Sequence, residues 1–132
     1  MTEKPPDLLS PSEKLLLCLC RTGPTLAEKE EISGLAAEVK DWDLFVRQAN
    51  EHGIVALAHE NLSEAGCSGL IPPGSSKTLY QGYLSSLARN TALSERLDHI
   101  LHLARQEGIR IILLKGMALE KTIYGNRGLR QM

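Results

Sequence analysis

Cysteine is scarce in this sequence, and the thiols form no recognisable motif. Cys18, Cys20 and Cys67 are an odd number in a chain of 132 residues, and none of them belongs to a CxxC pair. A disulfide framework needs paired cysteines, and a structural zinc site needs closely spaced thiolates or imidazoles. The cysteine pattern argues against both and predicts a reducing, cytoplasmic location.

Long apolar runs and a charge excess of one sign are also lacking. The run 15–20 is too short to span a bilayer, and the acidic, proline-bearing segment before it is unlike a signal peptide. Fifteen Lys and Arg stand against sixteen Asp and Glu, so the basic surface of a protein that coats nucleic acid is missing. The composition indicates a soluble, helix-leaning globular protein with no membrane partner and no strong nucleic-acid signal.

Capping signals predict short helices in the first half of the chain, after a loose lead-in over residues 1–9. Ser10 and Glu13 form a capping box for a helix to about residue 20. A helical pattern follows over 25–40, where Gly34 could divide it. Asp41 is the predicted N-cap of the next helix, Gly53 ends it, and a further helix covers 55–65.

Turn formers concentrate over residues 67–75, which makes this stretch the best candidate for a domain junction. A long helix to about residue 106 is expected after Ser75 or Ser76 as N-cap. Its apolar stripe consists of Leu79, Tyr83, Leu87, Leu97, Leu101 and Ala104, and it is widened by Tyr80, Leu84, Ala88 and Ile100. A stripe of this width predicts two packing neighbours.

The run 109–114 changes abruptly to apolar, β-branched residues and predicts a buried strand. A turn at Lys115 and Gly116, a helix over 117–124 and a loop over 125–128 follow. A single buried strand cannot satisfy its own backbone and needs a partner. Either another chain supplies that partner, or the natural protein continues beyond Met132; the second option is simpler.

Three pieces of the sequence together resemble the uncharacterised nucleotidyltransferase family of the polymerase-β-like superfamily. They are Asp-Trp-Asp-Leu at 41–44 with His-Gly-Ile-Val at 52–55, Asn90 in the long helix, and Gly-Ile-Arg-Ile-Ile-Leu-Leu-Lys-Gly at 108–116. The last piece is the most specific, and the likeness runs on through 118–119, 124–125 and 129–132. It covers about residues 41–132.

The resemblance implies a nucleotide site after the strand. In this superfamily a strand, a glycine-containing turn and a helix hold the triphosphate, and two acidic residues on the next strand bind Mg²⁺. Free amides at a turn into a helix suit phosphate, and metal ions neutralise charge as an oxygen is displaced. By this resemblance Gly116 allows close backbone approach, Lys115 contacts a phosphate, and Arg127 and Arg130 are weaker candidates for the same role.

The sequence departs from the family pattern at its end. Only Gln131 and Met132 follow Arg130, so the expected Asp-x-Asp pair is absent. Without two carboxylates the chain has no credible Mg²⁺ site, and we assign no catalytic residue and no metal ligand. Our hypothesis is a truncated product that is inactive alone: a complete protein would use Mg²⁺ and a nucleoside triphosphate, and neither is expected to bind this chain tightly.

Other chemically suggestive residues have simpler structural readings. His99 and His102 are three residues apart on the long helix and could share a metal, but a solvated helix face is the better interpretation. Glu28 and its acidic neighbours favour the first turn of a helix over a carboxylate site. Trp42 and Phe45 could stack on a base, but core anchoring is expected in a chain with so few large residues.

The predicted fold is mostly α (α+β), with a helical domain over 10–74 and the first helix, strand, turn and helix of an incomplete nucleotidyltransferase-type domain over 75–132. The predicted function is the N-terminal part of a protein that transfers a nucleotidyl group from a nucleoside triphosphate with Mg²⁺. The alternative is a non-enzymatic helical interaction module, and the unpaired strand could form a homodimer. The acceptor and the base preference are not written in these residues.

Overall fold

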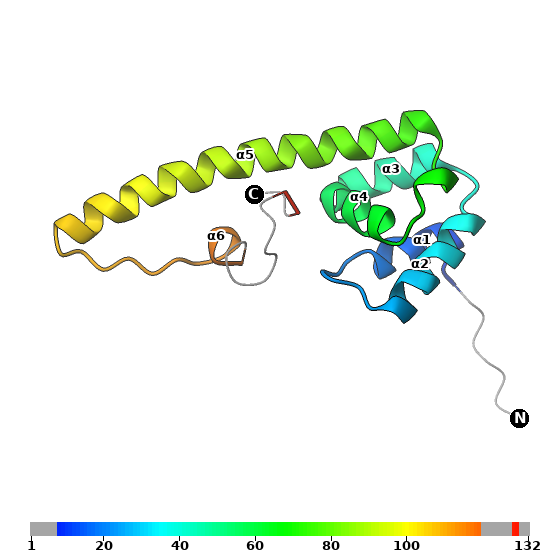
Figure 1. Cartoon of the computed structure of the whole chain (residues 1–132), viewed down its shortest axis with the longest axis horizontal. Coiled ribbons are helices and arrows are strands. Elements are labelled where there is room, and N and C mark those ends of the chain that lie inside the picture. The colour runs from blue at the N-terminus through cyan, green and yellow to red at the C-terminus, as the bar shows by residue number, and fades with distance from the viewer. Residues whose placement is uncertain (1–7, 120–127, 130–132) are drawn as a thin grey trace, which may run out of the picture.

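The computed structural model describes residues 8–119 together with 128 and 129. In chain order the elements are α1 (Pro11–Cys18), α2 (Leu26–Glu38), α3 (Trp42–Glu51), α4 (Val55–Glu64), the 3₁₀ turn η1 (Ser68–Leu70), α5 (Pro73–Gln106) and α6 (Gly116–Leu119). Figure 1 shows α1 to α4 gathered at one end of α5, while the other end of α5 extends beyond them. The prediction of a mostly helical fold is confirmed.

Side-chain caps begin the first three helices, and those at Ser10 and Asp41 are the ones that the sequence predicts. The amide of Glu13 donates to Oγ of Ser10 at 3.2 Å, and the amide of Ser10 donates to Oε2 of Glu13 at 2.8 Å. Thr25 and Glu28 form the same reciprocal pair at α2, and Oδ1 of Asp41 accepts from an amide at the start of α3. Each cap satisfies N–H groups that the helix leaves without a partner, which stabilises a helix by ~1 kcal/mol.

Glycines with left-handed backbone end three helices at the predicted positions. The φ angle is 69° at Gly53, 74° at Gly66 and 70° at Gly108, which follow α3, α4 and α5. α1 ends at Cys18, two residues earlier than predicted, and α2 continues through Gly34 without a division.

The start of α5 differs from the prediction. Its N-cap is Pro72, without a side-chain cap, so neither Ser75 nor Ser76 begins the helix. Pro73 has the fixed φ of the first helical position and cannot donate a hydrogen bond, so the helix begins there. Ser75 is buried in the first turn, where its hydroxyl donates to Oδ1 of Asp43 on α3 at 3.3 Å.

The core lies among α1 to α4 and the first turns of α5. Phe45 is fully buried, and its ring meets Trp42 edge to face with centroids 5.2 Å apart. The core-anchoring interpretation of these two aromatic residues is therefore confirmed. Asn61 of α4 is buried as well, and its Nδ2 donates to the carbonyls of Leu19 at 2.9 Å and Arg21 at 2.7 Å. This amide ties the end of α1 to α4.

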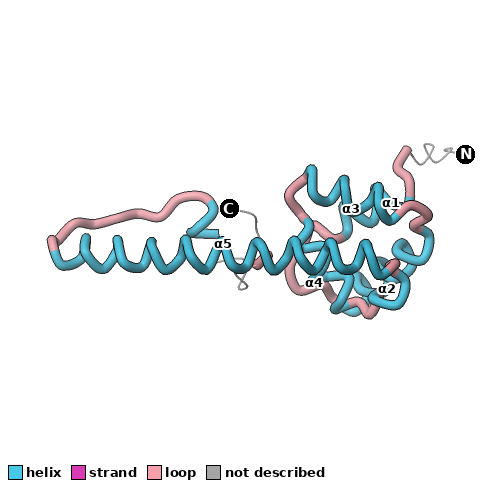
Figure 2. Tube along the Cα trace, turned by 90° about the horizontal axis from the view of Figure 1, so that it is seen from above, coloured by secondary structure: helices cyan, strands magenta, loops and turns pink. Residues whose placement is uncertain are grey.

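α5 packs against α4 and, less extensively, against α3. Gly82 is the point of closest approach, because a Cβ built there would lie 2.3 Å from Cγ1 of Val55 on α4. The tube in Figure 2 shows the remaining length of α5 running past the end of this bundle. Among the described residues, no helix combines the length and the apolar character needed to cross a bilayer.

The apolar stripe of α5 is narrower than the sequence predicts. The six residues of the main stripe are buried or half-buried, as expected. Of the residues that should widen it, Tyr80, Leu84 and Ile100 are exposed by 48%, 41% and 54%. The predicted widening is therefore wrong at these three positions, whereas the expected two neighbours are present, since both α3 and α4 pack on α5.

The run 109–114 forms no strand in this chain, contrary to the prediction of a buried one. Ile109 is 60% exposed, Ile112 84% and Leu114 77%. The reason is the one that the sequence already raises: no other described segment is a strand, so no backbone ladder can form. In Figures 1 and 2 this run passes back alongside the outer half of α5.

Residues 128 and 129 return the chain to the middle of α5. Leu129 is buried, and a Cβ built on Gly128 would lie 2.5 Å from Cε2 of Tyr83. Of the helix predicted over 117–124, residues 117–119 belong to α6, and the remainder lies outside the described residues. The division of the chain at residue 74 stays a prediction.

Candidate functional site

The turn before α6 contains two of the four residues predicted to contact a nucleotide. Gly108 ends α5, the run 109–114 follows, and α6 begins at Gly116. Lys115 is exposed and has a φ of 63°, the one positive φ of a non-glycine residue in the described part of the chain. Gly116, which follows it directly, is half-buried.

The backbone at Lys115 is unfavourable for a lysine. An L-residue in the left-handed region costs about 1 kcal/mol, and glycine is the usual occupant of such a position. Sparsely populated conformations of this kind cluster at binding and catalytic sites. Within the described residues no carboxylate pairs with the Lys115 ammonium, so its charge is available to an anion.

The other two predicted nucleotide contacts, Arg127 and Arg130, lie outside the described residues. Lys115 and Gly116 are consecutive in the sequence, so their proximity does not test the predicted site, which stays a prediction.

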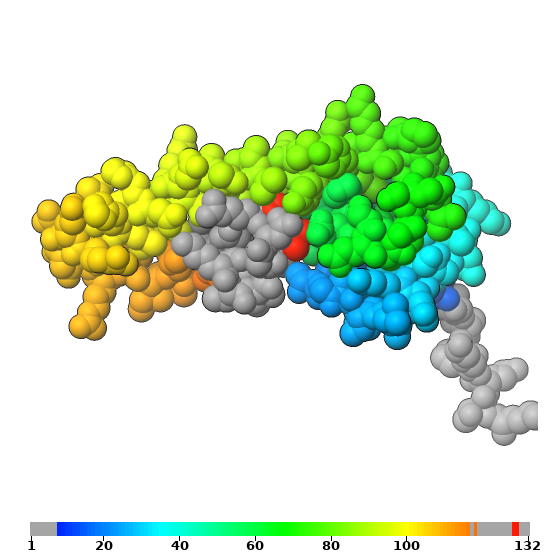
Figure 3. Space-filling model, in the orientation of Figure 1, coloured from blue at the N-terminus to red at the C-terminus, as the bar shows by residue number. Residues whose placement is uncertain are grey.

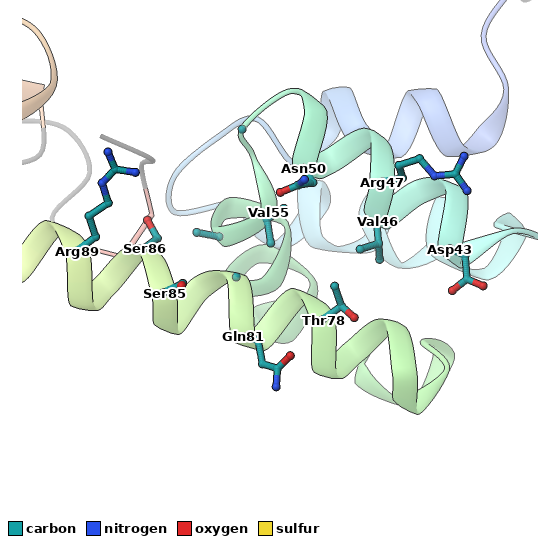
Figure 4. Close-up of a pocket in the computed structure, with 13 residues that line it drawn as sticks. Asp43, Val46, Arg47, Asn50, Val55, Thr78, Gln81, Ser85, Ser86 and Arg89 are labelled. Atoms are coloured by element: carbon teal, nitrogen blue, oxygen red, sulfur yellow. The ribbon is translucent and has the colours of Figure 1, made fainter.

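A groove that the sequence does not predict lies between α3, the start of α4 and α5. It has a volume of about 650 Å³, and Figure 4 shows Asp43 at one end and Arg89 at the other. Val55 and Gly82 contribute to its apolar part, and Asn50 and Ser85 to its polar part. The groove is open to solvent and most of its lining residues are polar, whereas small-molecule pockets are mostly enclosed and apolar. Polar residues at helical spacing along α5, opposite its apolar stripe, are the signal that could have indicated the groove.

The charges of the groove come from three side chains. Arg47 of α3 and Arg89 of α5 pair with no carboxylate in the described part of the chain, whereas the carboxylate of Asp43 accepts the Ser75 hydroxyl. The net charge of these three side chains is therefore positive. Both arginines are exposed, so water screens their charge.

Histidines and carboxylates do not assemble a metal site in the parts of the chain that the structure describes, where no cluster of three or more potential ligands occurs. His99 and His102 are exposed on the outer half of α5, in agreement with a solvated face. Glu28 caps α2 and pairs with Arg21, and Glu31 accepts from Sγ of Cys18 at 3.5 Å. This acidic cluster is used in capping and pairing.

Several titratable groups are shifted by their surroundings. Burial raises the pKa of the Glu60 carboxyl, and the neighbouring Glu64 raises it further. Burial also raises the pKa of the Cys18 thiol, as does Glu31, while Arg21 acts in the opposite direction. A thiol with a raised pKa is a poor nucleophile, so Cys18 serves as a small packing residue.

Burial shifts the pKa of His59 in the opposite direction, because the protonated form of histidine is the charged one. Its ring lies close to those of Tyr80 and Tyr83, with a centroid distance of 5.3 Å to each. Desolvation lowers the pKa of His59, because the imidazolium loses water there. This residue joins α4 to α5 as a neutral ring.

Comparison with known proteins gives one match. The model of a family described as Uncharacterised nucleotidyltransferase matches residues 38–132, from the end of α2 to the last residue of the chain. No curated protein and no solved structure matches the chain.

Proposed function

Because this chain belongs to the uncharacterised nucleotidyltransferase family, we propose that it is the N-terminal part of a protein that transfers a nucleotidyl group from a nucleoside triphosphate. In such a transfer an acceptor oxygen attacks the α-phosphorus, the bond to the bridging oxygen breaks, and pyrophosphate leaves. The family match over residues 38–132 includes the turn at Lys115 and Gly116.

At the level of residues, the proposal rests on the backbone conformation of Lys115. Its left-handed backbone would suit glycine better, yet the position holds an exposed ammonium with no described carboxylate partner. We propose that Lys115 contacts a phosphate oxygen and that Gly116 lets the backbone approach the same phosphate. Arg127 and Arg130 are proposed as further phosphate contacts.

We propose that the transfer uses Mg²⁺. Magnesium requires oxygen ligands with near-octahedral geometry, usually one or two carboxylates together with substrate phosphates. No cluster of three or more potential metal ligands occurs among the described residues, and we name no residue of this chain as a Mg²⁺ ligand. We propose that a complete protein binds Mg²⁺ together with the nucleoside triphosphate, and that this chain alone is inactive. We further propose a cytoplasmic location, since the sequence has three cysteines without a paired motif.

Titration of Mg²⁺-ATP into this chain, and into a version extended to the natural end of its source gene, tests the proposal. We expect binding by the extended protein and little by the 132-residue chain. In the extended protein, Lys115→Ala should weaken binding roughly 10-fold to 100-fold, the range for loss of a charge-assisted hydrogen bond.

Lys77→Ala is the matched control, because Lys77 is an exposed lysine on α5 away from the turn. It should leave the affinity unchanged. An extended protein that binds no nucleotide would contradict the proposed function. Equal affinities of Lys115→Ala and the unmodified protein would contradict only the role of Lys115.

A further inference from the structure

The groove between α3 and α5 lies along one side of the long helix. Figure 2, which looks down on α5, shows α3 and α4 on either side of it. α5 packs closely on α4, and the space-filling view in Figure 3 shows these two helices in contact. α3 meets α5 less extensively, and the groove opens to solvent between them.

The groove is elongated along α5. Its lining residues on this helix run from Thr78 to Arg89, a distance of about 16 Å at the helical rise of ~1.5 Å per residue. Figure 4 shows Arg47 near the Asp43 end and Arg89 at the other end. One small anion cannot reach from end to end, whereas an extended peptide of about five residues spans this length at ~3.3 Å per residue.

The groove offers unused hydrogen-bonding groups beside an apolar floor. Val46 and Ala56 are buried at the floor. The side chains of Asn50, Gln81 and Ser85 make no hydrogen bond to another described residue. A side-chain amide carries a donor and an acceptor next to each other, as a peptide bond does, so Asn50 and Gln81 can pair with the backbone of an extended chain.

Two other classes of partner fit the lining less well. Among the described residues that line the groove none is aromatic, so the bases of a single-stranded nucleic acid have no side chain on which to stack. An amphipathic helix binds in a groove that is mainly apolar, whereas the walls of this one are polar. The lining therefore favours an extended peptide.

The charges of the groove select acidic residues in that peptide. Arg47 and Arg89 are exposed, and neither pairs with a carboxylate in the described part of the chain. Asp43 is the one carboxylate among the described lining residues, and it accepts the hydroxyl of Ser75. A carboxylate near each end of a bound peptide would form charge-assisted hydrogen bonds with a guanidinium group.

We propose that the groove between α3 and α5 binds an extended acidic segment of a partner protein. Acidic side chains about five residues apart contact Arg47 and Arg89, and the amides of Asn50 and Gln81 bind the backbone between them. The groove contains none of the residues proposed to contact the nucleotide. The inference therefore concerns a protein partner and does not depend on nucleotidyl transfer.

Fluorescence polarisation with synthetic peptides tests the proposal on the whole 132-residue chain. The probe is a labelled, capped peptide with glutamate at its first and sixth positions and with serine and alanine elsewhere. We expect a Kd on the order of 100 μM. The same peptide with lysine in place of both glutamates should bind roughly 10-fold more weakly or less, and a peptide with two adjacent glutamates roughly threefold more weakly, because it reaches one arginine.

Charge reversal in the protein identifies the site. Arg47→Glu and Arg89→Glu should each weaken binding of the glutamate peptide roughly threefold to tenfold, and the double variant should prefer the lysine peptide. Arg96→Glu is the matched control, because Arg96 is an exposed arginine of α5 outside the groove, and it should leave the affinity unchanged. Asn50→Leu removes the amide at similar volume and should weaken binding roughly threefold to tenfold.

Several results would overturn the proposal. They are no binding of any peptide at ~1 mM, the weak limit of specific association, equal binding of the glutamate and lysine peptides, and insensitivity to both single reversals. A short single-stranded RNA that displaces the peptide at a lower concentration would assign the groove to nucleic acid instead. Displacement by glutarate at the peptide's own concentration would assign it to a small dicarboxylate. Circular dichroism of each variant separates loss of binding from loss of fold.

Discussion

At the scale of single residues, small side chains and backbone conformation decide how closely elements approach. Gly82 lets α5 meet Val55 of α4, and Gly128 lets the end of the chain meet Tyr83. At position 115, by contrast, a lysine occupies a left-handed backbone conformation that glycine adopts more easily. The first two positions serve packing, whereas we propose that the third serves binding.

Gly82→Ala should destabilise the chain by about 1–3 kcal/mol, the usual cost of overpacking, because the new Cβ would meet Cγ1 of Val55 at 2.3 Å. Urea denaturation measures the free energy of unfolding. Gly34→Ala in α2 is the matched control, since nothing lies within 4 Å of its Cβ. That variant should stabilise the chain by about 0.5–1 kcal/mol through helix propensity. A neutral Gly82→Ala would show that α4 and α5 can separate without cost.

At the scale of elements, the contact between α4 and α5 is the main attachment of the long helix to the bundle. Gly82 lies on this contact, and so does His59, whose ring lies close to two tyrosines of α5. Because the surroundings of His59 disfavour its charged form, the contact should depend on pH.

The free energy of unfolding should fall as the pH is lowered through the range in which histidine titrates. The pKa of folded His59 lies below its usual value near 6.5, so the unfolded chain binds the proton more readily. The contribution of His59 is therefore complete above about pH 6.5 and is lost as the pH falls through the folded pKa.

Urea denaturation between about pH 7.5 and 5 measures this loss against the usual histidine range. His59→Gln should show a smaller decline than the unmodified chain. His99→Gln removes an exposed histidine on the outer half of α5 and should leave the decline unchanged. Equal declines in all three proteins would exclude His59 as the source.

At the scale of the whole molecule, the chain is a bundle with one helix that continues beyond it (Figure 1). Local stability follows buried contacts, so a helix without neighbours opens more readily. The first half of α5 packs on α3 and α4, and its outer half lies alongside the run 109–114.

Hydrogen exchange should therefore divide α5 into two parts. Amides of residues 91–106 should exchange faster than those of 75–89, when measured at a protein concentration at which the chain is monomeric. Uniform protection along α5 would contradict the division.

The site was predictable only in part, for reasons that differ between its residues. The motif around Lys115 and Gly116 is local in sequence, so the resemblance could indicate it, but the left-handed backbone at Lys115 could not be read from residue types. The groove could not be predicted, because nothing in the sequence distinguishes Asn50, Ser85 and Arg89 from ordinary surface residues. Only the packing of α3 beside α5 brings them together.

The sequence by itself determined the helices and their ends. Capping boxes at Ser10 and Thr25 and glycines after α3, α4 and α5 act on neighbouring residues, so their effect does not depend on the rest of the fold. Tertiary structure decided whether residues 109–114 form a strand. A strand forms only when another strand completes its hydrogen bonds, and no such partner is present among the described residues. An apolar run that reads as a buried strand is therefore exposed in this chain.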